Sequence, residues 1–457
     1  MTIDPAGDAH HTSETNAGCR QPRGSQVALK KSRSCRRIAL TGVVAALVLS
    51  ACGGGGSAVD SATGNPLASD LPPAGAGPTP TGTPITIGLI ASSTGAFSET
   101  YAPAGPVSQA WADMVNKELG GINGHPVTVK VYDDQLQADK AAAAAREAVE
   151  QDGVVAIAIE SSVAGPAIAD YLDSKGVPII GGVNFARSAE NSPSTWFGTD
   201  IQAPQILQTT ANVAKDAGLH STVGVVCSEV PECAAIGKVQ QAYAPKVGID
   251  YKGTVTMAAD DTSATAQCLQ IVNEKPGGIA GYVTSNPLSK LLVECRTQGY
   301  TGPLILVSTY AKLFESLGDT PMYGMSTGFP WFADAAPAKQ FRDAVQRYGH
   351  GVDYRGYVQT TTWSTLELFR KAMQKDPASS ADVTSASVLG AYRQVKDETL
   401  DGLLPQPLTF TKDGPSPAIS CFWTIERDSK GEFKRVAFEG KSGNGAKGDL
   451  ASECVQS

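Results

Sequence analysis

Short apolar runs alternate with helix-like segments over most of this chain, and this alternation limits the folds that it can adopt. Seven runs of four to seven residues are apolar or alternating and rich in β-branched side chains. They are Ile85–Ala91, Pro126–Tyr132, Val154–Ile159, Val177–Ile180, Val223–Cys227, Gly278–Val283 and Leu304–Val307. Helix-like sequence lies between them, as in Gly105–Leu119 with its helical spacing of apolar residues and in the alanine-rich Asp139–Gln151. The pattern predicts an α/β fold whose parallel sheets are covered by helices on both faces.

The C-terminal part of the chain has a different pattern, which is typical of β-hairpins. The runs Pro407–Phe410, Ile419–Ile425 and Phe433–Phe438 are separated by the turn-forming sequences KDGPSP and RDSKGE. The 373 residues after Pro84 are too many for one hydrophobic core, which rarely grows beyond about 300 residues. We therefore expect two α/β domains.

The N-terminal segment has the features of a secretory leader. The apolar run Ile38–Leu49 follows a basic region and is too short for a membrane-crossing helix, which needs about 20 residues. The sequence Leu49-Ser50-Ala51-Cys52 resembles the bacterial lipobox, and this resemblance implies cleavage before Cys52 and a diacylglycerol on its thiol. The alternative is an ordinary signal peptide with an incidental cysteine. The glycines directly after Cys52 favour the lipoprotein, because a flexible tether needs such residues.

Residues 1–51 are thus expected to be the lipoprotein signal peptide, and residues 52–84 a flexible tether. From Gly53 to Pro84 the chain has almost no large apolar residues, so it buries too little surface to offset the entropy of ordering. A random coil of this length reaches roughly 30 Å. Because two acyl chains make a stable anchor, we expect the folded part to be held at the extracytoplasmic face of the bacterial cell membrane.

The net charge argues against nucleic acid as a partner. The whole chain has a formal net charge of −8, and residues 1–51 hold seven Lys/Arg and three Asp/Glu. Without this leader the chain carries −12. A strongly acidic protein repels the phosphate backbone of DNA and RNA.

Six cysteines follow Cys52, and their even number in an oxidising compartment predicts disulfides. They are Cys227, Cys233, Cys268, Cys295, Cys421 and Cys454. Pairing each cysteine with its sequence neighbour is the simplest of fifteen arrangements. Metal binding is the alternative, but no C-x-x-C spacing occurs and the histidines are far away in the sequence. We expect three disulfides and no cofactor.

Several segments, in the same order, resemble the periplasmic-binding-protein type 1 substrate receptors of branched-chain amino acid ABC transporters, the leucine/isoleucine/valine-binding family. They are ITIGLIASSTG (85–95), GGINGHPVTVKVYDDQ (120–135), Ala138–Glu150, ESSVAGPAIADYLDSKGVPIIGGVN (160–184) and the closing PLTFTKDGPSPAISCFWTI. The resemblance covers about residues 85–440. It implies two doubly wound parallel-sheet lobes joined by three crossings, with residues 85–199 and 330–400 in lobe one and residues 200–329 and 401–457 in lobe two.

The same resemblance implies ligand-binding residues in lobe one. Ser161 and Ser162 match a serine loop whose hydroxyl and N–H groups hold a ligand carboxylate. The alternative is an ordinary helix N-cap, and one serine can fill both roles. The other matching positions in this lobe are Ser93, Thr94, Tyr101, Val183, Asn184 and Phe185. At one of them, Phe185 replaces a threonine of the family, and Tyr101 is equally well explained by core packing.

In lobe two the match is weaker and points to Glu232, Ser285, Thr309 and Tyr310. Amino acid receptors of this family carry an acidic residue for the ligand ammonium where this chain has Thr309 or Tyr310. An ammonium buried without a counter-charge is costly. Either Glu232 or Glu160 supplies that charge, or the ligand has no α-ammonium, and the second alternative is favoured.

The resemblance implies a substrate receptor that captures a small polar solute, such as a branched-chain amino acid, an amide or an organic acid, for an ABC permease. The alternative is a ligand-sensing subunit that works with a membrane signalling partner. An enzyme is not expected, because the histidines after Cys52 stand outside GxSxG, HExxH or comparable patterns. Gly237-Lys238 also lacks the preceding glycine spacing of a phosphate-binding loop.

Overall fold

The structure is a computed structural model, and it describes most of the chain after residue 74. The described residues are 71, 75–182, 194–200, 203–229, 231–307, 311–375, 382–411, 414, 416–437 and 441–454. The predicted signal peptide and Cys52 lie outside them. No helix in the described part of the chain combines the length and the apolarity needed to cross a membrane.

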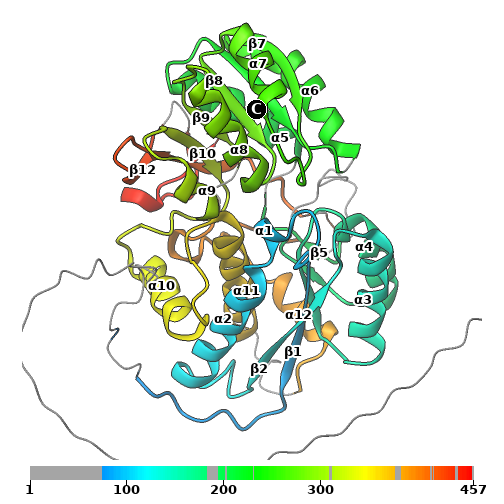
Figure 1. Ribbon diagram of the computed structural model, residues 1–457. Coiled ribbons are helices and arrows are strands. Elements are labelled where there is room, and N and C mark those ends of the chain that lie inside the picture. Colours follow the sequence, from blue (N-terminus) through cyan, green and yellow to red (C-terminus); the bar gives the residue numbers. More distant parts are fainter. Residues whose placement is uncertain are drawn as a thin grey trace, which may run out of the picture. The chain divides into compact units, whose positions relative to one another are not determined.

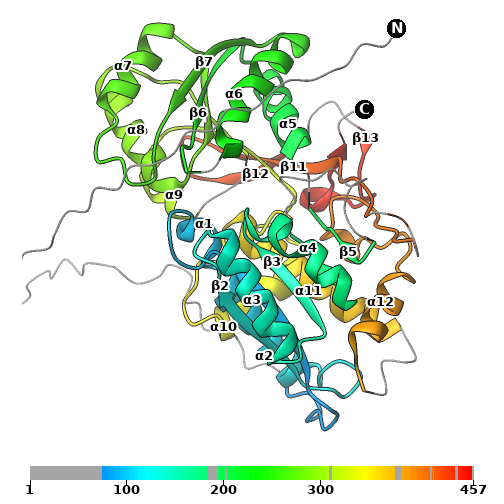
Figure 2. The ribbon, with the colours of Figure 1, turned by 90° about the vertical axis from the view of Figure 1, so that its right-hand side faces the viewer.

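The first sheet has five parallel strands in the order β2-β1-β3-β4-β5. Its strands are β1 (Ile85–Ala91), β2 (Val127–Asp133), β3 (Ala156–Glu160), β4 (Ile179–Ile180) and β5 (Trp196–Phe197). The associated helices are α1 (Ser98–Tyr101), α2 (Ala104–Glu118), α3 (Ala138–Glu150), α4 (Ala164–Lys175), α10 (Ala336–Tyr348), α11 (Tyr357–Lys375) and α12 (Ser385–Tyr392). Helices α3 and α4 lie on one side of the sheet, and α2 and α11 on the other (Figures 1 and 2).

Alternation along the strands of the first sheet explains this arrangement. In β1, Leu89 faces the core that includes α2 and α11, whereas Ile90 faces the core that includes α3 and α4. In β3, Ala158 faces the core that includes α2 and α11, and Ile159 faces the core that includes α3 and α4. Because successive side chains of a strand point to opposite faces, an unbroken apolar run is buried on both sides, as parallel sheets require. Glu160, next after Ile159, therefore points to the side of α2 and α11.

The second sheet has nine strands in the order β13-β14-β11-β10-β9-β8-β6-β7, with β12 paired to β11. Its strands are β6 (Ser221–Val226), β7 (Asp250–Thr256), β8 (Gly278–Tyr282), β9 (Leu304–Leu306), β10 (Met322–Ser326), β11 (Cys421–Arg427), β12 (Phe433–Val436), β13 (Lys441–Ser442) and β14 (Glu453–Cys454). Strands β6 to β10 pair in parallel, and β11 to β14 pair antiparallel. The helices that follow its parallel strands or precede them are α5 (Ala203–Asp216), α6 (Pro231–Tyr243), α7 (Thr265–Glu274), α8 (Ser285–Thr297) and α9 (Ala311–Ser316).

The α/β class with parallel sheets is confirmed, and so is the antiparallel pairing of the last two predicted runs, which form β11 and β12. The strand predicted at Pro407–Phe410 is wrong. Leu408 and Phe410 are buried, but only an isolated bridge joins Leu408 to Glu398. Residues near Glu398 have positive φ, which bends that segment away from an extended strand. The lobe boundaries stay a prediction.

The structure contains the three disulfides between sequence neighbours. Cys227–Cys233 links the end of β6 to α6, and Cys268–Cys295 links α7 to α8. Cys421–Cys454 links β11 to β14. Among the described residues, the one group with metal-ligating spacing is Cys227, Glu229 and Cys233. Both of its sulfur atoms are bonded to each other, so no thiolate is available to a metal there.

Part of the segment that composition assigns to the tether lies against the end of α2 and the loop that precedes β2. The backbone N–H of Gly77 donates to the carbonyl of Lys117 at 2.8 Å, and the N–H groups of Thr81 and Gly82 donate to the carbonyl of Gly124 at 3.0 and 2.9 Å. These hydrogen bonds hold residues 77–82 beside the C-terminal end of α2, in advance of β1.

Gly181, directly after β4, is a position where only glycine fits. Its φ is +69°, and a Cβ atom there would overlap Oγ1 of Thr365 on α11. We expect Gly181→Ala to lower the free energy of unfolding by about 2 kcal/mol, because it adds a collision to the cost of a left-handed backbone. Gly176→Ala is the matched control, since Gly176 also has a left-handed φ of +65° but open space around it. Equal losses in urea unfolding of the two variants would contradict the expectation.

Candidate functional site

The ends of β1, β2 and β3 bring three polar residues together at the carboxyl edge of the first sheet. Ser92 Oγ donates to Oδ1 of Asp134 at 2.7 Å, and Ser161 Oγ donates to Oδ2 of the same carboxylate at 2.5 Å. All three residues are buried. The three strands are neighbours in the sheet, and the carboxyl ends of parallel strands form the crevice where α/β folds bind ligands. Ser92 and Asp134 were not predicted, although Asp133-Asp134 directly after a strand was an available signal.

The hydroxyl of Ser161 makes all of its hydrogen bonds within the chain. Its Oγ accepts hydrogen bonds from the backbone N–H groups of Val163 and Ala164, each at 3.2 Å, where α4 begins. The same hydroxyl donates to Asp134, and the residue is only 2% exposed. Both the donor and the acceptor capacity of the hydroxyl are therefore used within the chain. These hydrogen bonds hold the turn that leads into α4, whose N-cap residue is Val163.

Ser162 differs from its neighbour in having an unused hydroxyl. Its Oγ is shielded from solvent and has no hydrogen-bond partner among the described residues. A buried polar group without a partner costs about 1–3 kcal/mol, and such groups in native proteins call for an explanation. A ligand group that exchanges a hydrogen bond with this hydroxyl would remove the cost.

Glu160 lies beneath this edge and faces α11. Its Oε1 accepts hydrogen bonds from the hydroxyls of Thr361 and Thr362, both at 3.1 Å. Burial and, to a smaller extent, the negative charge of Asp200 raise the pKa of Glu160 to about 8, and the hydrogen bonds from the two threonines act in the opposite direction. The carboxyl group is therefore mostly protonated at pH 7. A neutral carboxyl does not supply the counter-charge that a ligand ammonium needs.

Asp200 joins two segments that run between the sheets. It follows β5, and it accepts hydrogen bonds from the hydroxyl of Thr327, which follows β10, and from that of Tyr357 at the start of α11. The pKa of Tyr357 is raised well above its usual range by burial and by the charge of Asp200. This cluster links the segments that follow β5 and β10 to the start of α11.

The other predicted residues are distributed over several environments. Tyr101 is 7% exposed and packs in an apolar core to which both sheets contribute. Thr94 is exposed, and its Oγ1 donates to Oδ2 of Asp133 at 2.6 Å. Ser93 is half-buried and lines a cavity of about 530 Å³. Ser285 is buried as the first residue of α8, where its carbonyl accepts a hydrogen bond from Ser289.

The remaining predicted positions fall outside what the structure describes. They are Val183, Asn184, Phe185, Thr309, Tyr310, Cys52 and the side chain of Glu232. Of the residues named for the ligand site, the structure therefore brings Ser161 and Ser162 to one edge of the first sheet, with Ser93 on the loop after β1. The site as a whole stays a prediction.

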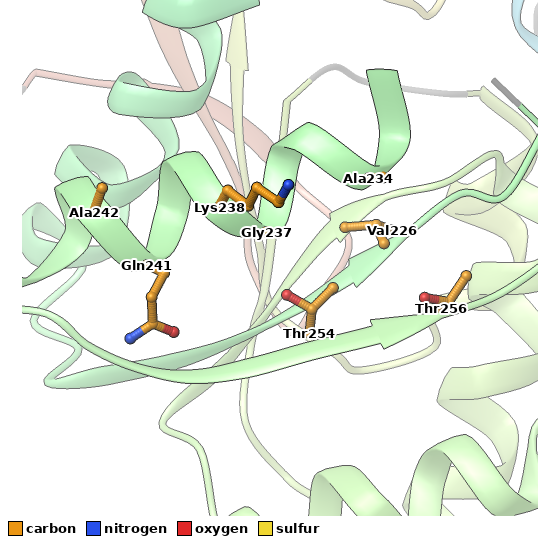
Figure 3. Close-up of a pocket in the computed structure, with 8 residues that line it drawn as sticks. All are labelled: Val226, Ala234, Gly237, Lys238, Gln241, Ala242, Thr254 and Thr256. Carbon is orange, nitrogen blue, oxygen red and sulfur yellow. The ribbon is translucent and has the colours of Figure 1, made fainter. Parts of the chain in front are cut away.

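A second hollow, of about 630 Å³, lies between α6 and β7 (Figure 3). Lys238 and Gln241 extend from α6 on one side of it, and Thr254 and Thr256 extend from β7 on the other. Lys238, Gln241 and Thr256 are exposed, so water satisfies their polar atoms. Most residues that line this hollow belong to α6, and Thr254 and Thr256 belong to the edge strand β7, which the sequence pattern did not predict.

The comparisons with known proteins agree with this fold. Residues 84–432 match a family model that is described as periplasmic binding protein. A comparison with curated protein sequences finds no match.

Solved structures from three organisms are similar over most of this chain. The leucine binding protein LivK from Thermotoga maritima is 17% identical with a TM-score of 0.60, and the match covers 77% of this chain and 98% of that one. The branched-chain amino acid transporter substrate binding protein LivJ from Streptococcus pneumoniae, in complex with isoleucine, is 16% identical with a TM-score of 0.61. That match covers 78% of this chain and 99% of LivJ. A fatty acid ABC transporter substrate-binding protein from Thermomonospora curvata is 19% identical with a TM-score of 0.63. That match covers 80% of this chain and 95% of the other. At these identities the similarity establishes the fold.

Proposed function

Since this chain belongs to the periplasmic binding protein family, we propose that it is the solute receptor of an ABC importer. It is held by a lipid on Cys52 at the extracytoplasmic face of the cell membrane and passes a small polar solute to a permease. It carries out no catalysis. Ligand contacts from both lobes stabilise the closed arrangement over the open one, which is how a two-lobed receptor signals that it is loaded.

The observation that carries this proposal is the shielded, unpartnered hydroxyl of Ser162. It lies at the carboxyl edge of the first sheet, beside the first turn of α4. Backbone N–H groups at a helix N-terminus carry partial positive charge and favour an anionic group. A carboxylate or amide oxygen of the solute would accept the hydrogen bond that Ser162 does not make within the described part of the chain.

The chemistry around this edge favours a solute without an α-ammonium. Glu160 is the acidic residue next to the serine loop, but its carboxyl group is turned to Thr361 and Thr362 and its pKa is raised to about 8. The similar receptors are described as binding leucine, isoleucine and a fatty acid, so this fold accepts acids with and without an amino group. We propose an organic acid or a neutral amide.

A thermal-shift screen of the purified protein tests this proposal. Amino acids, amides and organic acids are added at millimolar concentration, and a solute that binds only the native state raises the unfolding midpoint by mass action. We expect organic acids or amides to raise the midpoint and leucine, isoleucine and valine to leave it unchanged. A shift with those amino acids would contradict a solute without an α-ammonium, and Glu232 or Glu160 would then have to supply the counter-charge. A screen without any shift would argue against a receptor for these solute classes.

A further inference from the structure

Glu99, which belongs to the part of the chain that forms the first sheet, accepts a hydrogen bond from a helix of the second sheet. Glu99 lies on α1, after β1, and its Oε2 accepts a hydrogen bond from the backbone N–H of Asn286, the second residue of α8, at 3.0 Å. Its Oε1 lies 3.7 Å from Nζ of Lys312 on α9. The side chain of Glu99 is 19% exposed, whereas that of Lys312 is 70% exposed. The hydrogen bond to α8 is the shorter of the two contacts, and it lies at an exposed position of the protein.

Helix α8 has no side-chain cap from its own N-cap residue. Thr284 stands at the N-cap position, and its side chain makes no capping hydrogen bond. The first turn of a helix leaves backbone N–H groups without intrahelical partners and carries partial positive charge. A carboxylate is the group that best satisfies both. Glu99 supplies this cap to α8 from α1, which lies between β1 and β2 of the first sheet.

We propose that Glu99 is a latch between the two lobes. Every atom of the contact belongs to the chain itself, so the latch needs no solute to form. It stabilises the arrangement in which α1 touches α8, and it thereby lowers the free energy that a bound solute must supply to close the clamp. This inference rests on the proposed two-lobe closure, but its test does not depend on which solute binds.

Small-angle X-ray scattering of Glu99→Ala, without added solute, tests the latch. We expect a larger radius of gyration than in the wild-type protein, because the lobes separate once the cap is lost. Amide hydrogen exchange in the first turn of α8 should also become about fivefold faster, the effect of losing an N-cap. Glu150→Ala is the matched control. Glu150 pairs with Lys175 at 3.2 Å near the first sheet, and its replacement should change neither measurement.

Lys312→Glu is a second variant, chosen because Lys312 is exposed and its replacement does not disturb the core. It places a carboxylate opposite Glu99, and repulsion should enlarge the radius of gyration as well. If scattering of both variants matches the wild-type protein, the latch is excluded and Glu99 is only a local cap of α8. A thermal shift with a solute that persists in such variants would leave the proposed receptor function intact.

Discussion

Replacement of Glu160 by glutamine should make the protein more stable at neutral pH. The folded protein keeps a proton on this carboxyl group up to a pKa of about 8, whereas the unfolded chain loses it near the ordinary value of 4.5. Between these two values the unfolded chain binds fewer protons than the folded protein, so stability falls as the pH rises. From pH 4.5 to pH 7 this group alone removes about 3 kcal/mol of stability. Glutamine does not titrate, and its amide oxygen can accept the hydrogen bonds of Thr361 and Thr362.

Urea unfolding of the wild-type protein and of Glu160→Gln at several pH values between 4.5 and 8 measures this effect. The free energy of unfolding of the variant should exceed that of the wild-type protein by a margin that widens steadily over this range. Glu150→Gln is the control, because the exposed Glu150 carboxylate has a pKa lowered by its hydrogen bond from Lys175. The difference in free energy of unfolding between Glu150→Gln and the wild-type protein should not grow in favour of the variant as the pH rises. Parallel pH profiles for Glu160→Gln would mean that the folded protein ionises this group normally.

The neighbouring serines should respond in opposite ways to replacement by alanine. Ser161→Ala removes a hydrogen bond to the Asp134 carboxylate and the acceptor for two N–H groups of α4. We expect a loss of about 3 kcal/mol in the free energy of unfolding. Ser162→Ala removes a hydroxyl that has no partner among the described residues, so stability should be retained. Its affinity for the solute found by thermal shift should instead fall by about 1–3 kcal/mol, because a polar ligand group is left unsatisfied.

Urea unfolding and calorimetric titration of both variants separate the two roles. Ser174→Ala is the control on α4, where an exposed hydroxyl donates only to the carbonyl of Tyr171. It should change neither stability nor affinity. Wild-type affinity in Ser162→Ala would remove Ser162 from the site, and equal losses of stability in Ser161→Ala and Ser162→Ala would contradict the assignment of separate roles.

The buried strands were predictable because their apolar runs are continuous. Ile85–Ala91 coincides with β1 to the residue. Strand β7 was missed, since DYKGTVT at the sheet edge is half-exposed and carries Lys252 and Gly253 in place of an apolar run. Edge strands are often blunted in this way.

The candidate site was predictable only in part. Ser161 and Ser162 stand beside a recognisable strand, so their location followed from the pattern. Asp134 and Asp200 were missed, because their partners Ser161 and Tyr357 are 27 and 157 residues away in the sequence. Topology alone brings such residues together. The role of Glu160 was equally hidden, since its pKa is raised by burial and by the charge of Asp200, which lies 40 residues further along the chain.

The positions of the disulfides have a consequence for secretion. All three join elements of the second sheet or its helices, and the first sheet with its helices contains no cysteine. The first sheet can therefore complete its folding before any thiol is oxidised. The second sheet gains its covalent stabilisation, about 2–4 kcal/mol for a typical disulfide, only in an oxidising compartment. Under reducing conditions the elements of the second sheet would therefore lose stability selectively, whereas the first sheet and its helices would not.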